Sequence, residues 1–206
     1  PAMHLSKEDV AKTFHEVKGT PENYTPAEIT AYVRQFLREK YVAAEAGITG
    51  GNFLIADIGA VALTENEGNE WLSMAFPKVH IAIVGIEKII PSYADMELFW
   101  SLLATHGTGQ NVTVYNSILT GPKQENEMDG PEEMYVVLLD NGRTNVLEQV
   151  EQRRALHCIR CGACLNACPI YQSVGGHTYA SPYSGPIGSV LTPQLWGMKE
   201  YKHLSY

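Results

Sequence analysis

Hydrophobic residues recur every three or four positions in the N-terminal part of the chain, which is the spacing of amphipathic helices. The first stretch covers residues 10–17, and Ser6 with Asp9 three positions later has the pattern of a capping box ahead of it. A second stretch begins after Thr25, which is suited to cap a helix and is followed by proline. The pattern predicts two helices, of which the second packs on a sheet and ends at Gly47. Its apolar stripe consists of Ile29, Tyr32, Val33, Phe36 and Leu37.

From residue 52 onward the pattern changes to short apolar runs separated by turn residues, which is typical of strands. Two of the runs, 79–85 and 134–139, are nearly continuous, as expected of strands buried in a sheet. Further helices are predicted from Ser92 to Gly107 and from Val146 to Leu156. Strands that alternate with helices indicate an α/β fold with an at least partly parallel sheet. The predicted strands are 53–56, 60–64, 79–85, 112–115 and 134–139.

All four cysteines of the chain stand in one short run, followed directly by Pro169. The spacing is C-x2-C-x2-C-x3-C-P, which in bacterial-type iron-sulfur proteins gives three thiolates to one cubane and the fourth to a second cluster. Gly162 inside the run gives the backbone room to curl tightly. The run therefore predicts an iron-sulfur electron carrier. Its metal ligands are Cys158, Cys161, Cys164 and Cys168.

Zinc and disulfide bonds are the alternatives for these cysteines. Zinc sites usually bring two well-separated cysteine pairs rather than one continuous run. A disulfide framework would need a secreted chain, yet the polar first residues do not have the pattern of a signal peptide. Reduced thiols in the cytoplasm fit the run better. After Pro169, a segment rich in Gly, Ser, Tyr and Pro is predicted to form an ordered loop around the cluster.

Composition restricts the remaining choices. The 206 residues, 45% of them hydrophobic and 18% charged, can bury one sizeable core and carry an appendage. The formal net charge is −8 and no Lys/Arg-rich stripe occurs, so nucleic acid is not an expected partner. The longest apolar stretch, 81–90, is interrupted by charges and is too short to span a membrane.

Three further segments are candidates for binding a small anionic ligand. The loop at Gly50, Gly51 and Asn52 offers unobstructed backbone N–H groups, although tight turns use the same residues. Glu65, Glu67 and Asn69 cluster at a turn beside a strand end, where α/β sheets place binding crevices, but a solvated acidic turn has the same composition. Glu87 and Lys88 follow a buried strand and could pair with each other or face the same crevice.

Six blocks of the sequence, taken in order, resemble the LUD-domain iron-sulfur proteins of lactate utilisation, the lactate utilisation protein B family. The blocks are Gly47–Phe53, Glu65–Asn69, His80–Ala82 with Gly85–Lys88, Leu138–Arg143, the cysteine run and Gly185–Gly188.

The resemblance implies a LUD domain over residues 1–145, similar to the sugar-phosphate isomerase and CoA-transferase-like fold. Residues 146–206 would be the first part of a helical ferredoxin-like module. The resemblance further implies two [4Fe-4S] clusters. It also implies membership of a cytoplasmic system that oxidises L-lactate to pyruvate, in which the protein is a subunit rather than a stand-alone enzyme. A Ser-Ala-Thr-Gly-Gln type loop of the family appears here, with departures, as His106–Gln110, which adds Thr108 and Gln110 to the candidate ligand residues.

The resemblance also implies that the chain is an internal fragment, truncated at both ends. The fourth ligand of the first cluster would then come from a second cysteine run beyond Tyr206, so weak or absent cluster occupancy is expected in this chain alone. An alternative function is an α/β domain that binds or transfers a phosphorylated or CoA-linked metabolite, with regulatory clusters. A third is a scaffold for partner subunits.

Overall fold

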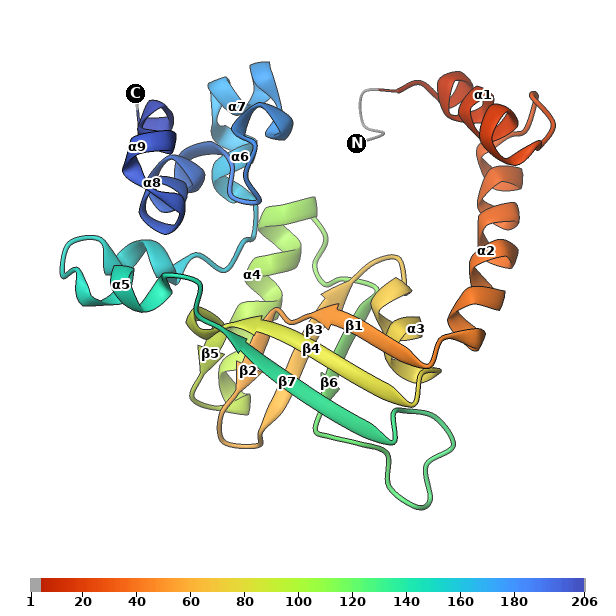
Figure 1. Ribbon diagram of the computed structural model, residues 1–206, viewed down its shortest axis with the longest axis horizontal. Helices are drawn as coiled ribbons and strands as arrows, with labels where there is room; N and C mark the ends of the chain where they lie inside the picture. The colour runs from red at the N-terminus through yellow and green to blue at the C-terminus, as the bar shows by residue number, and fades with distance from the viewer. Residues whose placement is uncertain (1–4, 206) are drawn as a thin grey trace. The chain divides into compact units, whose positions relative to one another are not determined.

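The computed structural model describes residues 5–205 and places them in two compact units, one up to Glu45 and one from Ala46 onward (Figure 1). The first unit contains α1 (Lys7–Lys18) and α2 (Pro26–Ala43). Both predicted capping boxes are confirmed, because Ser6 and Asp9 cap α1 while Thr25 and Glu28 cap α2. The two helices meet where the rings of Phe14 and Tyr32 pack edge to face, with 6.4 Å between their centroids.

The prediction that Gly47 ends α2 is wrong. The helix ends at Ala43, and Gly47 lies inside strand β1 (Ala46–Gly50). A Cβ atom at Gly47 would lie 1.8 Å from the carbonyl oxygen of Ser73, which belongs to α3 (Asn69–Ala75). The glycine therefore allows a helix to approach the strand closely rather than terminating a helix.

The second unit is built on two sheets (Figure 1). The first is wholly parallel and has the order β1-β4-β7. The second has the order β5-β2-β3-β6, with antiparallel pairs on both sides of β3 and a parallel pair between β2 and β5. The predicted α/β fold with a partly parallel sheet is confirmed. The strands are β2 (Phe53–Ile55), β3 (Ala60–Glu65), β4 (Val79–Gly85), β5 (Ile89–Ile90), β6 (Tyr115–Leu119) and β7 (Glu133–Leu139).

Alternate side chains of β3 are buried on opposite faces of the strand, in two different hydrophobic clusters. Val61 and Leu63 are buried in a cluster with Ala82 and Val84 of β4 and with Met74 of α3. The intervening residues of β3, on its other face, are buried in a second cluster with α4 (Met96–Thr108). The second sheet therefore lies between the parallel sheet and α4, because successive side chains of a strand point to opposite faces.

The strand predicted at 134–139 is confirmed, but its predicted burial is wrong. In β7, Tyr135 is 53% exposed and Leu138 is 50% exposed, since β7 lies at the edge of the parallel sheet. The neighbouring β4 buries alternate residues, and Ile83 between them is 40% exposed. Apolar composition thus predicted the strands correctly without revealing that one face of the sheet is left open.

Other boundaries differ from the predictions for local reasons. The strand predicted at 112–115 is largely wrong, because β6 spans Tyr115–Leu119 and shares only Tyr115 with it. The Thr113 side chain ahead of β6 instead bonds Thr64 and Asn116. The predicted helix at 146–156 is two short helices, since the Gln149 N–H bonds back to the carbonyl of Val146 and closes the first of them. The predicted helix after Ser92 is confirmed with a 3-10 turn ahead of it.

The segment predicted as a loop around the cluster is ordered but partly helical. Gly185 begins a twelve-residue helix with Pro186 in its first turn, where the missing N–H of proline has no helical partner to lose. The predicted boundary at residue 145 stays a prediction. The remaining helices are η2 (Ile86–Lys88), η3 (Tyr93–Asp95), α5 (Arg143–Glu148), η4 (Arg153–His157), α6 (Ala163–Ala167), α7 (Pro169–Val174), η5 (Gly176–Tyr179), α8 (Gly185–Trp196), α9 (Met198–Tyr201) and η6 (Lys202–Ser205).

Candidate functional site

The cysteine run is a tight loop between two short helical segments. It leaves η4 at Cys158, turns through two residues with positive φ, Arg160 at 61° and Gly162 at 80°, and enters α6. Cys168 then caps α7, with Pro169 in the first turn of that helix. The short helix α6 therefore separates the first three cysteines from Cys168.

The loop divides the four cysteines into three and one. Cys158, Cys161 and Cys164 line one cavity of about 280 Å³, whose other walls include Leu165 and Tyr183. Cys168 is not among the residues lining the cavity, and its sulfur instead accepts the N–H of Tyr171 at 3.4 Å. A division of this kind is what the C-x2-C-x2-C-x3-C-P spacing needs if the first three thiolates serve one cluster and the fourth serves another.

The donor set of the cavity fits an iron-sulfur cluster. All four cysteines are free thiols and are partly buried. Within residues 5–205, no three side chains of His, Cys, Asp or Glu converge closely enough to hold a single metal ion. A cubane places its four irons at separate corners, so its thiolates surround it instead of meeting at one point. Cys158, Cys161 and Cys164 would hold three of those corners.

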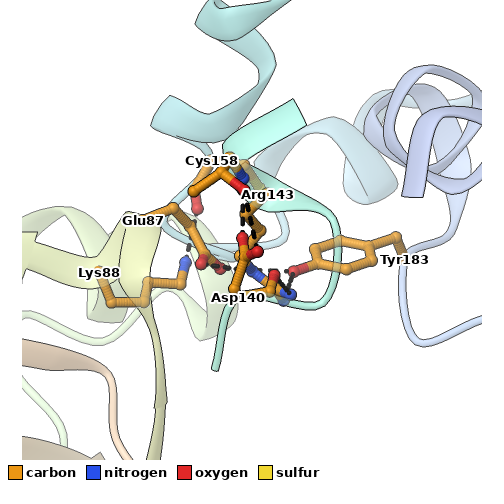
Figure 2. Close-up of polar contacts among 7 residues, drawn as sticks. Glu87, Lys88, Asp140, Arg143, Cys158 and Tyr183 are labelled. Atoms are coloured by element: carbon orange, nitrogen blue, oxygen red, sulfur yellow. Dashed lines mark hydrogen bonds and ion pairs between the residues drawn. The ribbon is translucent and has the colours of Figure 1, made fainter. Parts of the chain in front are cut away.

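A buried lysine bonds the backbone of the first cysteine. Lys88 in η2 is 8% exposed, and its ammonium donates to the carbonyl of Cys158 at 2.6 Å (Figure 2). Burial lowers the pKa of Lys88, while the nearby Glu87 and Cys158 oppose that shift. The contact joins the end of strand β4 directly to the cysteine loop.

Beside this lysine, Glu87 and Arg143 form a buried ion pair (Figure 2). The distance from Arg143 Nε to Glu87 Oε2 is 2.5 Å, and both side chains are less than 10% exposed. Arg143 also donates to the carbonyl of Asp140 at 2.9 Å and to the Tyr183 hydroxyl at 3.1 Å. The Tyr183 hydroxyl in turn donates to Glu87 at 3.5 Å. Three segments distant in sequence are thereby tied to one another next to the cavity.

This network differs from the pairing considered for Glu87 and Lys88. Glu87 pairs with Arg143, whereas Lys88 bonds a backbone carbonyl. Arg143 and Tyr183 were not predicted as site residues. A buried arginine seldom occurs without an acidic partner, but no local pattern indicated that this arginine would be buried.

Glu65, one of the predicted ligand residues, serves the fold as a helix cap. Its carboxylate accepts the backbone N–H groups of Glu70 at 2.9 Å and Trp71 at 2.7 Å, at the start of α3. Glu67 is exposed and accepts the N–H of Asn66, and Asn69 is the exposed first residue of α3. A ligand role for Glu65, Glu67 and Asn69 stays a prediction.

The other predicted ligand residues make polar contacts around the same end of β3. Asn52 accepts the N–H of Thr64, while Gln110 and Asn66 exchange two amide hydrogen bonds of 3.1 Å. Thr108 donates to Gln110 at 2.6 Å. The structure therefore brings Asn52, Thr108 and Gln110 to the strand end that carries Glu65. It directs Lys88 to the cysteine loop and Glu87 to Arg143.

The glycines of the predicted anion loops have packing roles. A Cβ atom at Gly51, which follows β1, would lie 2.6 Å from the Val84 side chain and 3.0 Å from the Val61 side chain, so the backbone here passes too close to β4 and β3 for a side chain. Gly50 has open space around it. Gly107 lies within α4, and a Cβ atom on it would approach the carbonyl of Cys161 to 3.0 Å. Gly109, with φ at 74°, ends the helix. A ligand role for Gly50 and Gly51 also stays a prediction.

Glu70 gives the acidic turn a predictable pH dependence. Burial, followed by the charges of Glu65 and Glu67, raises the pKa of Glu70 above its ordinary value of 4.5. Because the folded chain then binds its proton more tightly than the unfolded chain does, ionised Glu70 destabilises the fold at neutral pH. Replacing Glu70 with glutamine should therefore increase the free energy of unfolding at pH 7. The gain should shrink as the pH falls through the raised pKa and disappear below 4.5.

Denaturant unfolding at a series of pH values would measure this gain. Glu132→Gln is the control, since Glu132 is exposed and the charges that raise the pKa of Glu70 are those of Glu65 and Glu67. A stabilisation by Glu70→Gln that is equally large at pH 4 and pH 7 would contradict the assignment.

Comparison with known proteins agrees with this geometry. Residues 1–139 match the LUD domain family, and residues 154–204 match the 4Fe-4S dicluster domain family. Over all 206 residues the chain is 47% identical to lactate utilization protein B of Shouchella clausii and 48% identical to the protein of that name from Bacillus subtilis. The chain spans 43% of the length of each.

A solved structure, a DUF162 family protein from Deinococcus radiodurans, covers 49% of this chain and 57% of its own. It has a TM-score of 0.36 and 19% sequence identity, which is too distant to support an argument. Within residues 5–205, none of the helices has both the length and the apolar character needed to cross a membrane. The LUD match extends over two thirds of the sequence, and the chain belongs to the LUD-domain family.

Proposed function

We propose that this chain is part of an iron-sulfur electron-transfer subunit in a cytoplasmic system that oxidises L-lactate to pyruvate. The observation that carries the proposal is the cavity lined by Cys158, Cys161 and Cys164, with Cys168 turned to a separate helix cap. Lactate as the substrate rests on the names of the relatives, which are lactate utilization proteins B.

The chain's own residues would hold the cluster and shield it. Bound iron and sulfide would supply one-electron redox chemistry. The apolar side chains of Ile159, Leu165 and Ile187 stand beside the cysteines and limit the access of water. Shielding of this kind protects the cluster and contributes to its reduction potential.

The proposal includes a docking surface for partner subunits of the system. Electron relays pass electrons between proteins, so a cluster must lie near a docking surface. Arg160 and His157 of the cysteine loop are exposed, and both border the cavity. We propose that this loop faces the partner subunit that receives or delivers the electron.

The proposal is tested with the full-length protein purified without oxygen and reconstituted with iron and sulfide. Reduction should give the EPR signals of [4Fe-4S] clusters, and L-lactate should bleach the visible absorption when the partner subunits are present. D-lactate serves as the control substrate. A colourless protein that takes up zinc but no acid-labile sulfide would overturn the proposal.

A further inference from the structure

Lys88 is a buried cation without a carboxylate of its own. Among the ion pairs of residues 5–205, Glu87 pairs with Arg143 and none includes Lys88. The ammonium of Lys88 instead donates to the carbonyl of Cys158. Burying a charge destabilises the fold unless an opposite charge lies next to it. The described residues place no carboxylate in an ion pair with Lys88, so they offset only part of the free energy lost on desolvating its ammonium.

The charges around Lys88 leave a positive balance beside the cysteine loop. The charges of Glu87 and Arg143 offset each other, because the two groups lie 2.5 Å apart. Lys88 therefore contributes the net charge of this buried group. Its hydrogen-bond partner, Cys158, lines the cavity with Cys161 and Cys164. An anionic group held by those thiolates would offset the cost of burying the ammonium.

We propose that Lys88 is a positioning residue that anchors Cys158 and sets the reduction potential of the cluster held by Cys158, Cys161 and Cys164. The inference rests on the proposed iron-sulfur function. When such a cluster accepts one electron, its negative charge increases by one, and no proton needs to move. A fixed positive charge beside it stabilises the reduced form more than the oxidised form. The α/β domain thereby tunes a redox centre that lies in another part of the sequence.

The position of Lys88 in the fold supports a fixed geometry. The lysine follows the last residue of β4 by three positions and sits in the short helix η2. Next to it, a Cβ atom at Gly85 would lie 2.2 Å from Glu87 Oε2, so glycine makes room for the carboxylate of the ion pair. The ion pair and the lysine thus occupy one rigid corner at the end of a parallel strand, rather than a mobile loop.

The test is an EPR-monitored redox titration of the reconstituted full-length protein and its variants. Lys88→Met removes the charge and keeps most of the side-chain length. At a fixed potential it should lower the ratio of reduced to oxidised cluster roughly tenfold, which is about 59 mV for a one-electron couple. Lys88→Arg keeps the charge and should stay near the wild-type potential. Lys78→Met is the matched control, because Lys78 is exposed just before the other end of the same strand.

Glu87→Gln provides a second, opposite test. It removes the negative charge of the ion pair while keeping the shape of the side chain, so the potential should rise. A fully loaded Lys88→Met protein with the wild-type potential would overturn the inference and leave the proposed function intact. If Lys88→Met does not fold or load, Lys88→Gln decides, because its neutral amide can still donate a hydrogen bond, and an unchanged or higher potential in that variant overturns the inference. A wild-type protein without any cluster overturns both.

Discussion

Replacing Cys161 with alanine in the full-length protein is expected to remove one cluster and leave the other, with the loss of about half of the bound iron. Cys161 lines the cavity together with Cys158 and Cys164, so its loss takes one of three neighbouring thiolates from a single cluster. Cys168→Ala should also lower the iron content, but through the other cluster. The reason is that Cys168 is not among the cavity-lining residues and stands at the start of α7.

Iron and acid-labile sulfide per chain, together with EPR spectra of the reduced proteins, would measure these losses. The spectra of Cys161→Ala and Cys168→Ala should be complementary, each retaining the signal that the other has lost. Ser184→Ala is the matched control, since Ser184 lines the same cavity without offering a thiol. Identical spectra for the two cysteine variants would contradict the division of the run into three and one.

The predictions that succeeded rest on interactions between residues close in sequence. The capping boxes at Ser6 and Thr25 each close over three positions, so the residues themselves show where those helices begin. The cysteine run is likewise local, because its spacing decides which sulfurs can face one cluster. Both features could be read without knowledge of the rest of the fold.

The features that sequence reasoning missed depend on contacts between distant segments. Lys88 and Cys158 are 70 positions apart, and Tyr183 and Glu87 are 96 positions apart. No periodic pattern connects such residues, and the identity of a charged residue does not reveal whether its side chain is buried or solvated. The exposure of β7 was missed for a related reason, since an apolar strand has the same composition in the middle of a sheet and at its edge. Gly47 was predicted to end a helix from its local sequence alone. Its actual role is to let α3 approach β1 closely, and that contact joins residues distant in sequence.

The buried ion pair gives the second large expected effect. Replacing Arg143 with methionine should lower the free energy of unfolding by about 3–5 kcal/mol. The loss arises because Glu87, whose side chain is 6% exposed, would keep its charge without a partner. Arg143 also holds the Asp140 carbonyl and the Tyr183 hydroxyl, so the variant breaks contacts of three segments at once. Denaturant unfolding of the cluster-free protein would measure the change without any contribution from bound iron.

A double-mutant cycle separates two contributions to the loss of stability, the unpaired charge of Glu87 and the lost packing of the Arg143 side chain. Glu87→Gln combined with Arg143→Met should recover most of the lost stability, because a neutral amide is less costly to bury than a lone carboxylate. Arg153→Met is the control for removing an arginine, as Arg153 is exposed. If Arg143→Met cost less than about 1 kcal/mol, the pair would behave like a solvated one. The corner that joins β4 to the cysteine loop would then be held by packing and by the Lys88 hydrogen bond instead.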